Sequence, residues 1–471
     1  MEKKIVFICN DKEIITEIHP AITVLDFLRK NMSLTGTKEG CREGDCGACT
    51  VLLGELKNDN VIYKTVNSCI LPISSVNGKH IVTIEGLNSN QLSPIQTFMV
   101  EEGGTQCGFC TPGFIVSMTG YFLTHDKYDN ESAVDSLDGN ICRCTGHTSI
   151  KRAAVRSVDF YNEHKNETLT QSGLVPAYFT EIPKRLRNLK SKLDQNGAVD
   201  MTVQYNIAGG TDLFVQKWED IYKSVVEFIS GKDNGDLFFV KDDVCIVNAS
   251  ATVSDIMASD IMNKYFPDVK IYFSTFGSLP IRNRATLGGN IVNASPIADL
   301  TNFFLALNSK VILADKDMAN NRTVNLKDLY LGYKTLDIKP GELIKSVSFK
   351  LPSQNSHFSY EKVSRRTYLD IASVNTSMYI EYENRIIREI HISAGGVGPI
   401  PMYLSYTRDF LLNKKIDSEI ISDAAQIAIS EISPISDARG SVEYKKILLR
   451  QLIFAHFLKL FPELVNYEEL V

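Results

Sequence analysis

Eight of the ten cysteines in this 471-residue sequence fall into two tight sets, and they are its strongest candidates for chemistry. In a reducing compartment such sets are typical of metal or cluster ligands and not of disulfides. Iron–sulfur clusters are held by four thiolates and transfer electrons, so the two sets predict one-electron transfer. The other two cysteines, Cys9 and Cys245, lie in apolar segments and are expected to be core residues.

The first set places Cys41, Cys46 and Cys49 in one glycine-rich loop, and Cys69 follows after a strand–turn–strand stretch. This is the C-x4-C-x2-C…C spacing of plant-type [2Fe-2S] ferredoxins. The loop must aim three thiolates at a flat cluster, and small residues such as Gly44 permit that close approach. A structural zinc site is the alternative, but zinc sites usually pair two short Cys-x-x-Cys knuckles.

The second set consists of two short cysteine pairs on either side of a helical pattern that runs to Leu123. The phrase QCGFCTPG supplies Cys107 and Cys110, and the phrase GNICRCTG supplies Cys142 and Cys144. Taken alone, four cysteines in this arrangement could bind either zinc or a second [2Fe-2S] cluster.

The elements around the first loop are expected to be two strands, a helix and a late strand. They cover residues 3–9, 13–18, 24–31 and 81–84. This order resembles the β-grasp fold of plant-type ferredoxins and covers residues 1–86.

Both cysteine sets together resemble the iron–sulfur region of the molybdenum hydroxylase family, which includes xanthine dehydrogenase, aldehyde oxidoreductase and carbon monoxide dehydrogenase. The resemblance implies that residues 87–165 form a four-helix bundle whose [2Fe-2S] cluster lies beside a molybdopterin. It also places Gln106 and Cys144 near the pterin. One departure is His147, where relatives commonly carry tyrosine, and a packing role is expected for it.

Two glycine-rich segments follow a polar linker at residues 166–174. The first spans residues 206–213, and the second runs from Phe276 to Asn290 and continues to Asp299. Paired glycines can turn successive backbone amides toward an anion such as a pyrophosphate. No G-x-G-x-x-G fingerprint opens a helix, so a non-Rossmann nucleotide fold is predicted.

Both segments resemble the FAD-binding domain of the same hydroxylases, a non-Rossmann α+β fold of the vanillyl-alcohol-oxidase/PCMH type, here over residues 175–355. Tyr360–Ser373 resembles the stretch that contributes a lysine and Asp-Ile-Ala to the flavin, although its charges could also be a solvated face. Ser373 is a departure there, since many xanthine dehydrogenases carry a longer or charged residue. The FAD contacts that the resemblance implies are Asn206, Ile207, Ala208, Gly209, Gly210, Thr211, Asp212, Leu213, Phe276, Thr286, Gly289, Asn290, Asp299, Lys362 and Asp370.

Residues 356–471 resemble the C-terminal α+β domain of these flavoproteins, which makes the predicted chain a multidomain α+β protein. With 44% hydrophobic and 23% charged residues it has the composition of globular domains. The net charge of −6 argues against nucleic acid. No signal peptide or membrane span is recognised, so a cytoplasmic location is expected.

A chain that carries both clusters and the flavin but no molybdenum region resembles the small subunit of bacterial two-subunit xanthine dehydrogenases. That resemblance implies a large molybdopterin-binding partner in an α2β2 heterotetramer. Electrons would pass from the partner through the second cluster, then the first, to FAD and NAD+, and no catalytic residue is predicted on this chain beyond its FAD site. A subunit of an aldehyde or N-heterocycle hydroxylase, a non-enzymatic electron carrier, and oxygen as the acceptor are the alternatives.

Overall fold

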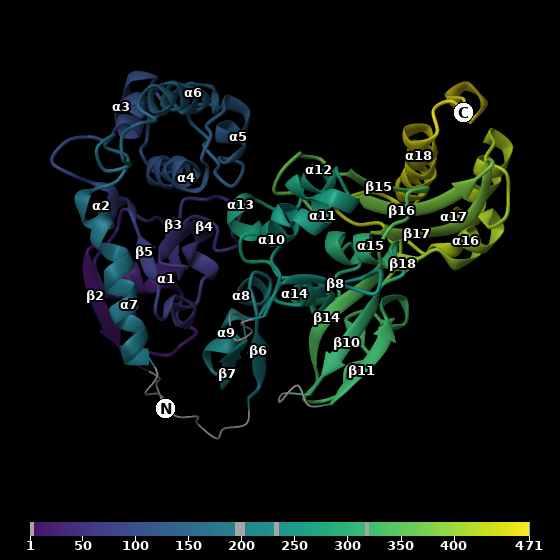
Figure 1. Ribbon diagram of the computed structural model, residues 1–471, viewed down its shortest axis with the longest axis horizontal. Coiled ribbons are helices and arrows are strands. Elements are labelled where there is room, and N and C mark those ends of the chain that lie inside the picture. The colour runs from purple at the N-terminus through teal and green to yellow at the C-terminus, as the bar shows by residue number, and fades with distance from the viewer. Residues whose placement is uncertain (1–3, 194–202, 230–234, 316–319, 471) are drawn as a thin grey trace. The chain divides into compact units, whose positions relative to one another are not determined.

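The computed structural model describes residues 4–193, 203–229, 235–315 and 320–470. Its fold is multidomain α+β, as predicted (Figure 1). Two compact units divide the chain: Met1–Ser230 with Gly277–Arg284, and Gly231–Phe276 with Ala285–Val471. Within the described ranges, none of the helices combines the length and the apolar character that crossing a membrane requires.

The first unit begins with a five-stranded sheet in the order β2-β1-β5-β3-β4. Strand β1 lies between β2 and β5, antiparallel to β2 and parallel to β5, and all five of its residues are buried. This mixed sheet confirms the ferredoxin-type domain. The strands are β1 (Ile5–Cys9), β2 (Lys12–Thr16), β3 (Thr50–Lys57), β4 (Asn60–Asn67) and β5 (His80–Val82).

One helical segment packs under this sheet, where the sequence predicts a helix over residues 24–31. It begins as α1 (Val24–Asp26), capped by Thr23, and continues as the π-helix η1 (Phe27–Asn31). Phe27 lies edge-on to Phe7 of β1, with their ring centroids 5.8 Å apart. Two short 3-10 turns, η2 (Ser68–Ile70) and η3 (Ile73–Val76), link β4 to β5.

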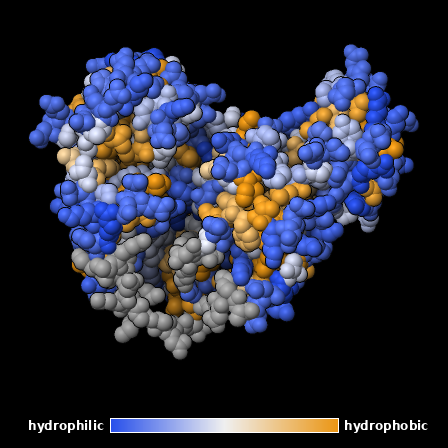
Figure 2. All heavy atoms as spheres, viewed as in Figure 1, coloured by the Kyte–Doolittle hydropathy of each residue, from blue (hydrophilic) through white to orange (hydrophobic). Residues whose placement is uncertain are grey.

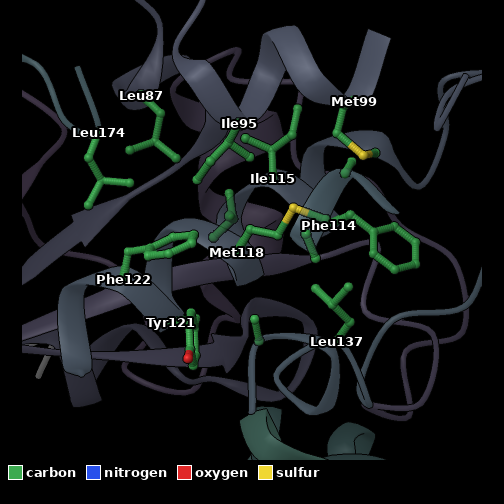
Figure 3. Packing of buried hydrophobic residues seen from close by; sticks show 14 of the residues in the cluster. Leu87, Ile95, Met99, Phe114, Ile115, Met118, Tyr121, Phe122, Leu137 and Leu174 are labelled. Atoms are coloured by element: carbon green, nitrogen blue, oxygen red, sulfur yellow. The ribbon is translucent and has the colours of Figure 1, made fainter. Parts of the chain in front are cut away.

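Four helices then enclose the core shown in Figure 3. Helix α4 is the central one, since its residues from Gly113 to Phe122 are all buried. A reciprocal cap between Ser93 and Gln96, with Pro94 at the first helical position, fixes the start of α3. After a short turn of helix, α2 (Ile84–Leu87), the four helices are α3 (Pro94–Glu101), α4 (Thr111–Thr124), α5 (Asn130–Asp135) and α6 (Thr148–Glu163).

The segment after the helical domain returns to the ferredoxin sheet. Leu174 joins the helical core, and η4 (Ala177–Glu181) leads into α7 (Ile182–Leu193). Helix α7 presents an apolar stripe to β1, because Ile182, Leu186 and Leu189 are spaced one helical turn apart. The predicted boundaries assign residues 166–174 to a linker and residues 175–355 to the FAD-binding domain, and they remain predictions.

The remainder of the first unit is a small α/β element and one separate turn of helix. Strands β6 (Tyr205–Ile207) and β7 (Val226–Phe228) pair in parallel, and α8 (Leu213–Gln216) and α9 (Trp218–Tyr222) connect them. The turn is α13 (Leu279–Arg282), which comes from the second glycine-rich segment.

The second unit contains a five-stranded sheet in which all pairs are antiparallel, unlike the mostly parallel Rossmann sheet. Its order is β11-β10-β14-β9-β8. These strands are β8 (Phe238–Lys241), β9 (Val244–Asn248), β10 (Lys310–Ala314), β11 (Asn321–Asn325) and β14 (Leu343–Lys350). The helices are α10 (Val253–Ala258), α11 (Asp260–Tyr265), α12 (Val269–Ser274), α14 (Leu287–Asn293) and α15 (Asp299–Leu305).

A short hairpin, β12 (Tyr330–Gly332) with β13 (Thr335–Leu336), precedes the C-terminal layer. In that layer α16 (Ser405–Leu411), α17 (Ser418–Glu431) and α18 (Val442–Leu460) share a core with an antiparallel sheet. Its strands are β15 (Ser356–Val363), β16 (Val374–Glu383), β17 (Ile386–Gly395) and β18 (Met402–Tyr403). Hydrophilic side chains cover most of the face seen in Figure 2.

Candidate functional site

The first cysteine loop lies between the helical segment that ends at Asn31 and strand β3. Gly44 and Gly47 adopt positive φ angles of 82° and 67°, which a side chain would strain. The Sγ of Cys41 accepts the amide hydrogens of Glu43 at 3.3 Å and Cys46 at 3.4 Å. The loop therefore turns its amides toward sulfur.

The four sulfurs of this set form two pairs. The Cys41 thiol interacts with that of Cys46, which lowers the pKa of Cys41 to about 5 and raises the pKa of Cys46. Cys49 and Cys69 form the other pair, with the pKa of Cys49 lowered and that of Cys69 raised, because the Cys49 thiolate accepts a hydrogen bond from the Cys69 thiol. Two sulfurs for each of two irons is what a [2Fe-2S] cluster requires, so the set fits the predicted group.

A charged network anchors the outer side of this loop. Arg42 donates two hydrogen bonds to Asp26, at 2.8 and 3.1 Å, and also pairs with Glu39. Burial acts to raise the pKa of Asp26, but hydrogen bonds from Arg42, Lys30 and Thr23 lower it to about 2. Sequence reasoning missed this network, whose signal was the arginine directly after the first cysteine ligand.

The second cysteine set joins the start of α4 to the loop before α6. Cys110 is the N-terminal cap of α4, and Cys144 Sγ lies 3.6 Å from Cys107 Sγ. The amide of Phe109 and then the Cys144 thiol lower the pKa of Cys107, while the pKa of Cys144 is raised by Cys107. Cys142 is the partner of Cys110, so this set also consists of two pairs and fits a [2Fe-2S] cluster.

Thr145 and His147 hold Cys142 in place. Thr145 donates to Cys142 Sγ from its hydroxyl at 3.2 Å and from its amide at 3.4 Å, which lowers the pKa of Cys142 against the effect of burial. His147 Nε2 accepts the amide hydrogen of Cys142 at 3.1 Å, and burial lowers the pKa of the ring. His147 packs edge-on to Phe114, as expected, but its hydrogen bond to a predicted ligand was not foreseen.

The two cysteine loops contact each other directly. The Ile141 amide donates to the carbonyl of Cys46 at 3.0 Å, and Asn140 Nδ2 donates to the carbonyl of Gly47 at 3.2 Å. Ser117 of α4 holds the Asn140 side chain at 2.7 Å. One hydrogen bond therefore connects the backbone beside Cys142 to a ligand of the first set.

Among the described residues, no group of three or more His, Cys, Asp or Glu side chains is arranged to hold a single metal ion. The cysteines instead occur as pairs of sulfurs, four to a set. Cys9 and Cys245 are buried elsewhere and have their pKa raised to about 12 by burial, which confirms the prediction that they are core residues.

The first glycine-rich segment packs beside the first cysteine set within the first unit. Ile207 and Phe214 share an apolar cluster with Cys49 and Cys69. Gly210 has a φ of 72°, and the Phe214 amide donates to its carbonyl to start α8. The side-chain oxygen of Asn206 is buried without a hydrogen-bond partner, which leaves an acceptor for a ligand donor. The remaining predicted contacts in this loop are Ala208, Gly209, Thr211, Asp212 and Leu213.

In the second unit, the second glycine-rich segment forms the start of α14. Thr286 caps this helix by accepting the Gly289 amide hydrogen at 3.1 Å. The Asn290 side chain accepts two hydrogen bonds from Thr301 of α15, each at 3.1 Å. Asn290 therefore joins two helices, and Phe276, the first residue of the segment, is half-buried.

Asp299 and Lys362 form a mostly buried ion pair at 2.8 Å. Lys362 also donates to the Thr275 carbonyl at 2.9 Å, and Tyr360 and Asn375 donate to Asp299. Lys362 is thus not part of a solvated charged face. The structure brings two predicted flavin contacts together in this pair, and sequence reasoning missed Tyr360 and Asn375.

Two residues in the predicted flavin stretch have local roles. Asp370 accepts the Arg366 amide hydrogen at 2.9 Å in the turn after β15. Its hydrogen bonds are therefore local, and they do not involve the ion pair of Asp299 and Lys362. Ser373, the departure from the family pattern, donates to the Arg439 carbonyl at 2.8 Å. This bond links the turn to the segment that precedes α18.

Four known domain families match successive parts of the chain. A 2Fe-2S iron-sulfur cluster binding domain matches residues 7–74, and a [2Fe-2S] binding domain matches residues 83–155. An FAD binding domain in molybdopterin dehydrogenase matches residues 182–353, and a CO dehydrogenase flavoprotein C-terminal domain matches residues 358–460. Together these matches indicate two [2Fe-2S]-binding domains followed by an FAD-binding domain and a flavoprotein C-terminal domain.

Individual relatives are distant in sequence. Xanthine dehydrogenase 1 of Arabidopsis thaliana is 27% identical over 93% of this chain, and aldehyde oxidase 1 of Macaca fascicularis is 27% identical over 97%. The chain spans only 38% and 39% of the length of these two proteins. Quinoline 2-oxidoreductase from Pseudomonas putida 86 is a similar solved structure, with a TM-score of 0.48 and 23% identity over 54% of this chain and 88% of that one.

Proposed function

We propose that this chain is the iron–sulfur and FAD electron-transfer subunit of a xanthine dehydrogenase. Electrons would arrive from a molybdopterin centre on a large partner chain and leave as NADH. In this proposal Cys107, Cys110, Cys142 and Cys144 bind the cluster that receives electrons. Cys41, Cys46, Cys49 and Cys69 bind the cluster that passes them to FAD.

The observation that carries this proposal is the junction between the two cysteine loops. The Ile141 amide, next to Cys142, donates to the carbonyl of Cys46 at 3.0 Å. Asn140 and Ser117 hold this junction in the buried interior. A fixed, buried connection between two four-cysteine sets supports electron transfer between them.

The exposure of the two sets supports the order of transfer. Gln106, Cys107 and Cys144 are exposed, and so is Phe109 beside them. Cys49 and Cys69 are buried together with the first glycine-rich segment. The second set can therefore meet a redox centre on another chain, while the first set faces the predicted flavin loop.

FAD, when bound, supplies the chemistry that converts single electrons into a hydride for NAD+. The residues proposed to hold it are those predicted from the sequence: Asn206, Ile207, Ala208, Gly209, Gly210, Thr211, Asp212, Leu213, Phe276, Thr286, Gly289, Asn290, Asp299, Lys362 and Asp370. Within the second unit, the ion pair with Asp299 and the Thr275 carbonyl hold the Lys362 ammonium in a fixed position.

The substrate belongs to the proposed partner, and relatives named as xanthine dehydrogenase and as aldehyde oxidase have the same 27% identity. Affinity purification of the chain from its native source, under gentle conditions, tests the partner. We expect a molybdenum-containing large chain in an α2β2 assembly that oxidises hypoxanthine and xanthine. Turnover of aldehydes or N-heterocycles alone would replace the xanthine assignment, and a complex without molybdenum would contradict the whole proposal.

The acceptor is tested separately on the purified complex. Anaerobic NADH should bleach the visible flavin absorption, and NAD+ should restore it after reduction by substrate. If NADH leaves the flavin oxidised, and a flavin that substrate has reduced is rapidly reoxidised in air, oxygen is the acceptor.

A further inference from the structure

Arg284 is a buried arginine between the first cysteine set and the first glycine-rich segment, all within the first unit. It follows α13, and its guanidinium donates from Nη2 to the carbonyl of Gly209. Its other terminal nitrogen, Nη1, is buried and has no hydrogen-bond partner. Only 8% of the residue is exposed.

A buried cation without an anionic partner is costly, because desolvation of the charge is not offset. Burial lowers the pKa of Arg284 to about 10, so the side chain still carries its charge at neutral pH. Arg282, two residues earlier in α13, shows the usual solution: it pairs with Asp138 at 2.6 Å, and both side chains are buried. Arg284 has no such carboxylate among the described residues.

Cys69 lies close enough to Arg284 for a charge on its sulfur to favour the protonated guanidinium, and a cysteine that binds iron carries that charge as a thiolate. Cys69 lies in an apolar cluster with Cys49, Ile207 and Ile281, and such surroundings screen charge interactions poorly. A cluster held by four thiolates carries net negative charge, and that charge increases by one when it accepts an electron.

We propose that Arg284 is a positioning residue whose charge makes the cluster bound by Cys41, Cys46, Cys49 and Cys69 easier to reduce. The inference rests on the proposed function, since it requires that cluster. The added electron comes from the second cluster, and no bond forms or breaks at Arg284. Its second role is mechanical: the bond to Gly209 fixes the glycine-rich segment at the side of the cluster from which the electron leaves.

The test is a redox titration of the complete chain with both clusters bound, followed by electron paramagnetic resonance. Arg284→Met removes the charge and keeps the length of the side chain. At a fixed potential we expect the ratio of reduced to oxidised first cluster to fall at least about tenfold, which is about 59 mV for one electron. The ratio of reduced to oxidised second cluster should change by less than about twofold in the same sample, which is about 18 mV on that scale.

Two further variants separate charge from structure. Arg284→Lys keeps the charge and should stay within about threefold of the parent ratio, whereas a neutral side chain should not. Arg42→Gln removes a cation that lies beside Cys41 but is already paired with Asp26 and Glu39, so it should have a smaller effect than Arg284→Met. If Arg284→Met loses iron from the first site while Arg284→Lys retains it, a charge requirement is also supported.

The flavin phosphate is the competing anion, and protein stripped of FAD distinguishes it. A shift that persists without FAD supports the cluster as the partner of Arg284. An unchanged first-cluster potential, with only FAD retention lowered, would overturn the inference, as would loss of iron from both Arg284 variants. In either case two intact cluster signals in the parent protein would leave the proposed function standing.

Discussion

The two cysteine sets have the same number of ligands but differ in how the fold surrounds them. In the ferredoxin-type set, Cys49 and Cys69 are only 1% and 4% exposed and pack in an apolar cluster, and Cys41 and Cys46 are half-buried. In the helical set, Cys107 and Cys144 are exposed, and only Cys142 is buried. A set built from a loop and a sheet edge is enclosed by its own domain, whereas one built from two helix starts leaves an edge open.

This difference teaches which set is suited to exchange electrons outside the chain. Electron transfer requires close approach of a partner's centre, and an exposed pair of ligands permits it. The enclosed set is suited to internal transfer, because its neighbours are the first glycine-rich segment and the loop of the other set.

Serine substitution of one ligand in each set should remove one cluster and leave the other. Cys49→Ser and Cys107→Ser should each lose about half of the iron, since each [2Fe-2S] cluster holds two irons. Iron analysis and electron paramagnetic resonance should show one signal lost in each variant, and a different one. Cys49→Ser should also unfold at a lower temperature than Cys107→Ser, because it places a hydroxyl in an apolar core.

Cys245→Ser is the matched control for these two variants, since Cys245 is buried but belongs to neither set. It should keep the iron of both clusters. Loss of both signals from either ligand variant would show that the two sites do not form independently.

Chelation should distinguish the two clusters by rate. The exposed edge of the helical set needs little local opening to admit a chelator, whereas the enclosed set needs part of its domain to open. We expect the helical signal to decay at least about tenfold faster than the ferredoxin-type signal, since local openings are much more frequent than opening of a core. Equal decay rates would mean that exposure does not control access.

Asn140→Ala should weaken the junction that joins the two sets. The substitution leaves the Ser117 hydroxyl without its acceptor, and an unsatisfied buried group costs about 1–3 kcal/mol. The Gly47 carbonyl loses the Asn140 donor but still accepts hydrogen bonds from Thr50. The free energy of unfolding should fall by an amount in that range, and the magnetic coupling between the reduced clusters should decrease. Asn162→Ala, which removes an exposed amide, should change the stability by less than about 0.5 kcal/mol.

Asp26→Asn should have the smallest effect and the clearest pH dependence. The pKa of Asp26 is lowered to about 2 in the folded protein, so its contribution is complete above about pH 4 and is lost as the pH falls through 2. Because solvent screens these partly exposed charges, we expect the Asp26 carboxylate to contribute about 1 kcal/mol to the free energy of unfolding at pH 7. The difference in melting temperature should stay constant from pH 7 to pH 5, and a gap that closes in that range would contradict the assignment.

Much of the fold followed from local sequence signals. The strands and the helical segment around the first loop begin and end within two residues of the predicted positions, because each is an apolar run bounded by turn residues. The non-Rossmann form of the flavin-binding part was predictable from the missing G-x-G-x-x-G fingerprint. The packing of α7 on β1 was not foreseen, since an amphipathic helix does not encode which sheet it will cover.

The candidate sites divide in the same way. The eight cysteines could be named from spacing, since ligand spacing in a loop reflects the size of the group it must surround. The roles of His147, Asn140 and Arg284 depend on groups far away in the chain, so no local pattern reveals them. Lys362 looked like part of a charge run, and only the fold supplied Asp299 as its partner.

Residue types and spacing were enough to predict which thiols hold clusters and in which order the domains follow one another, and the sequence contains no Rossmann fingerprint. Only the tertiary structure decided that one set is enclosed and the other open, that Ile141 joins them, and that a buried arginine stands between the first set and a glycine-rich segment. The physical reason is that ligand identity is a property of residues near in sequence. Exposure and charge environment are properties of neighbours that folding brings together from distant parts of the chain.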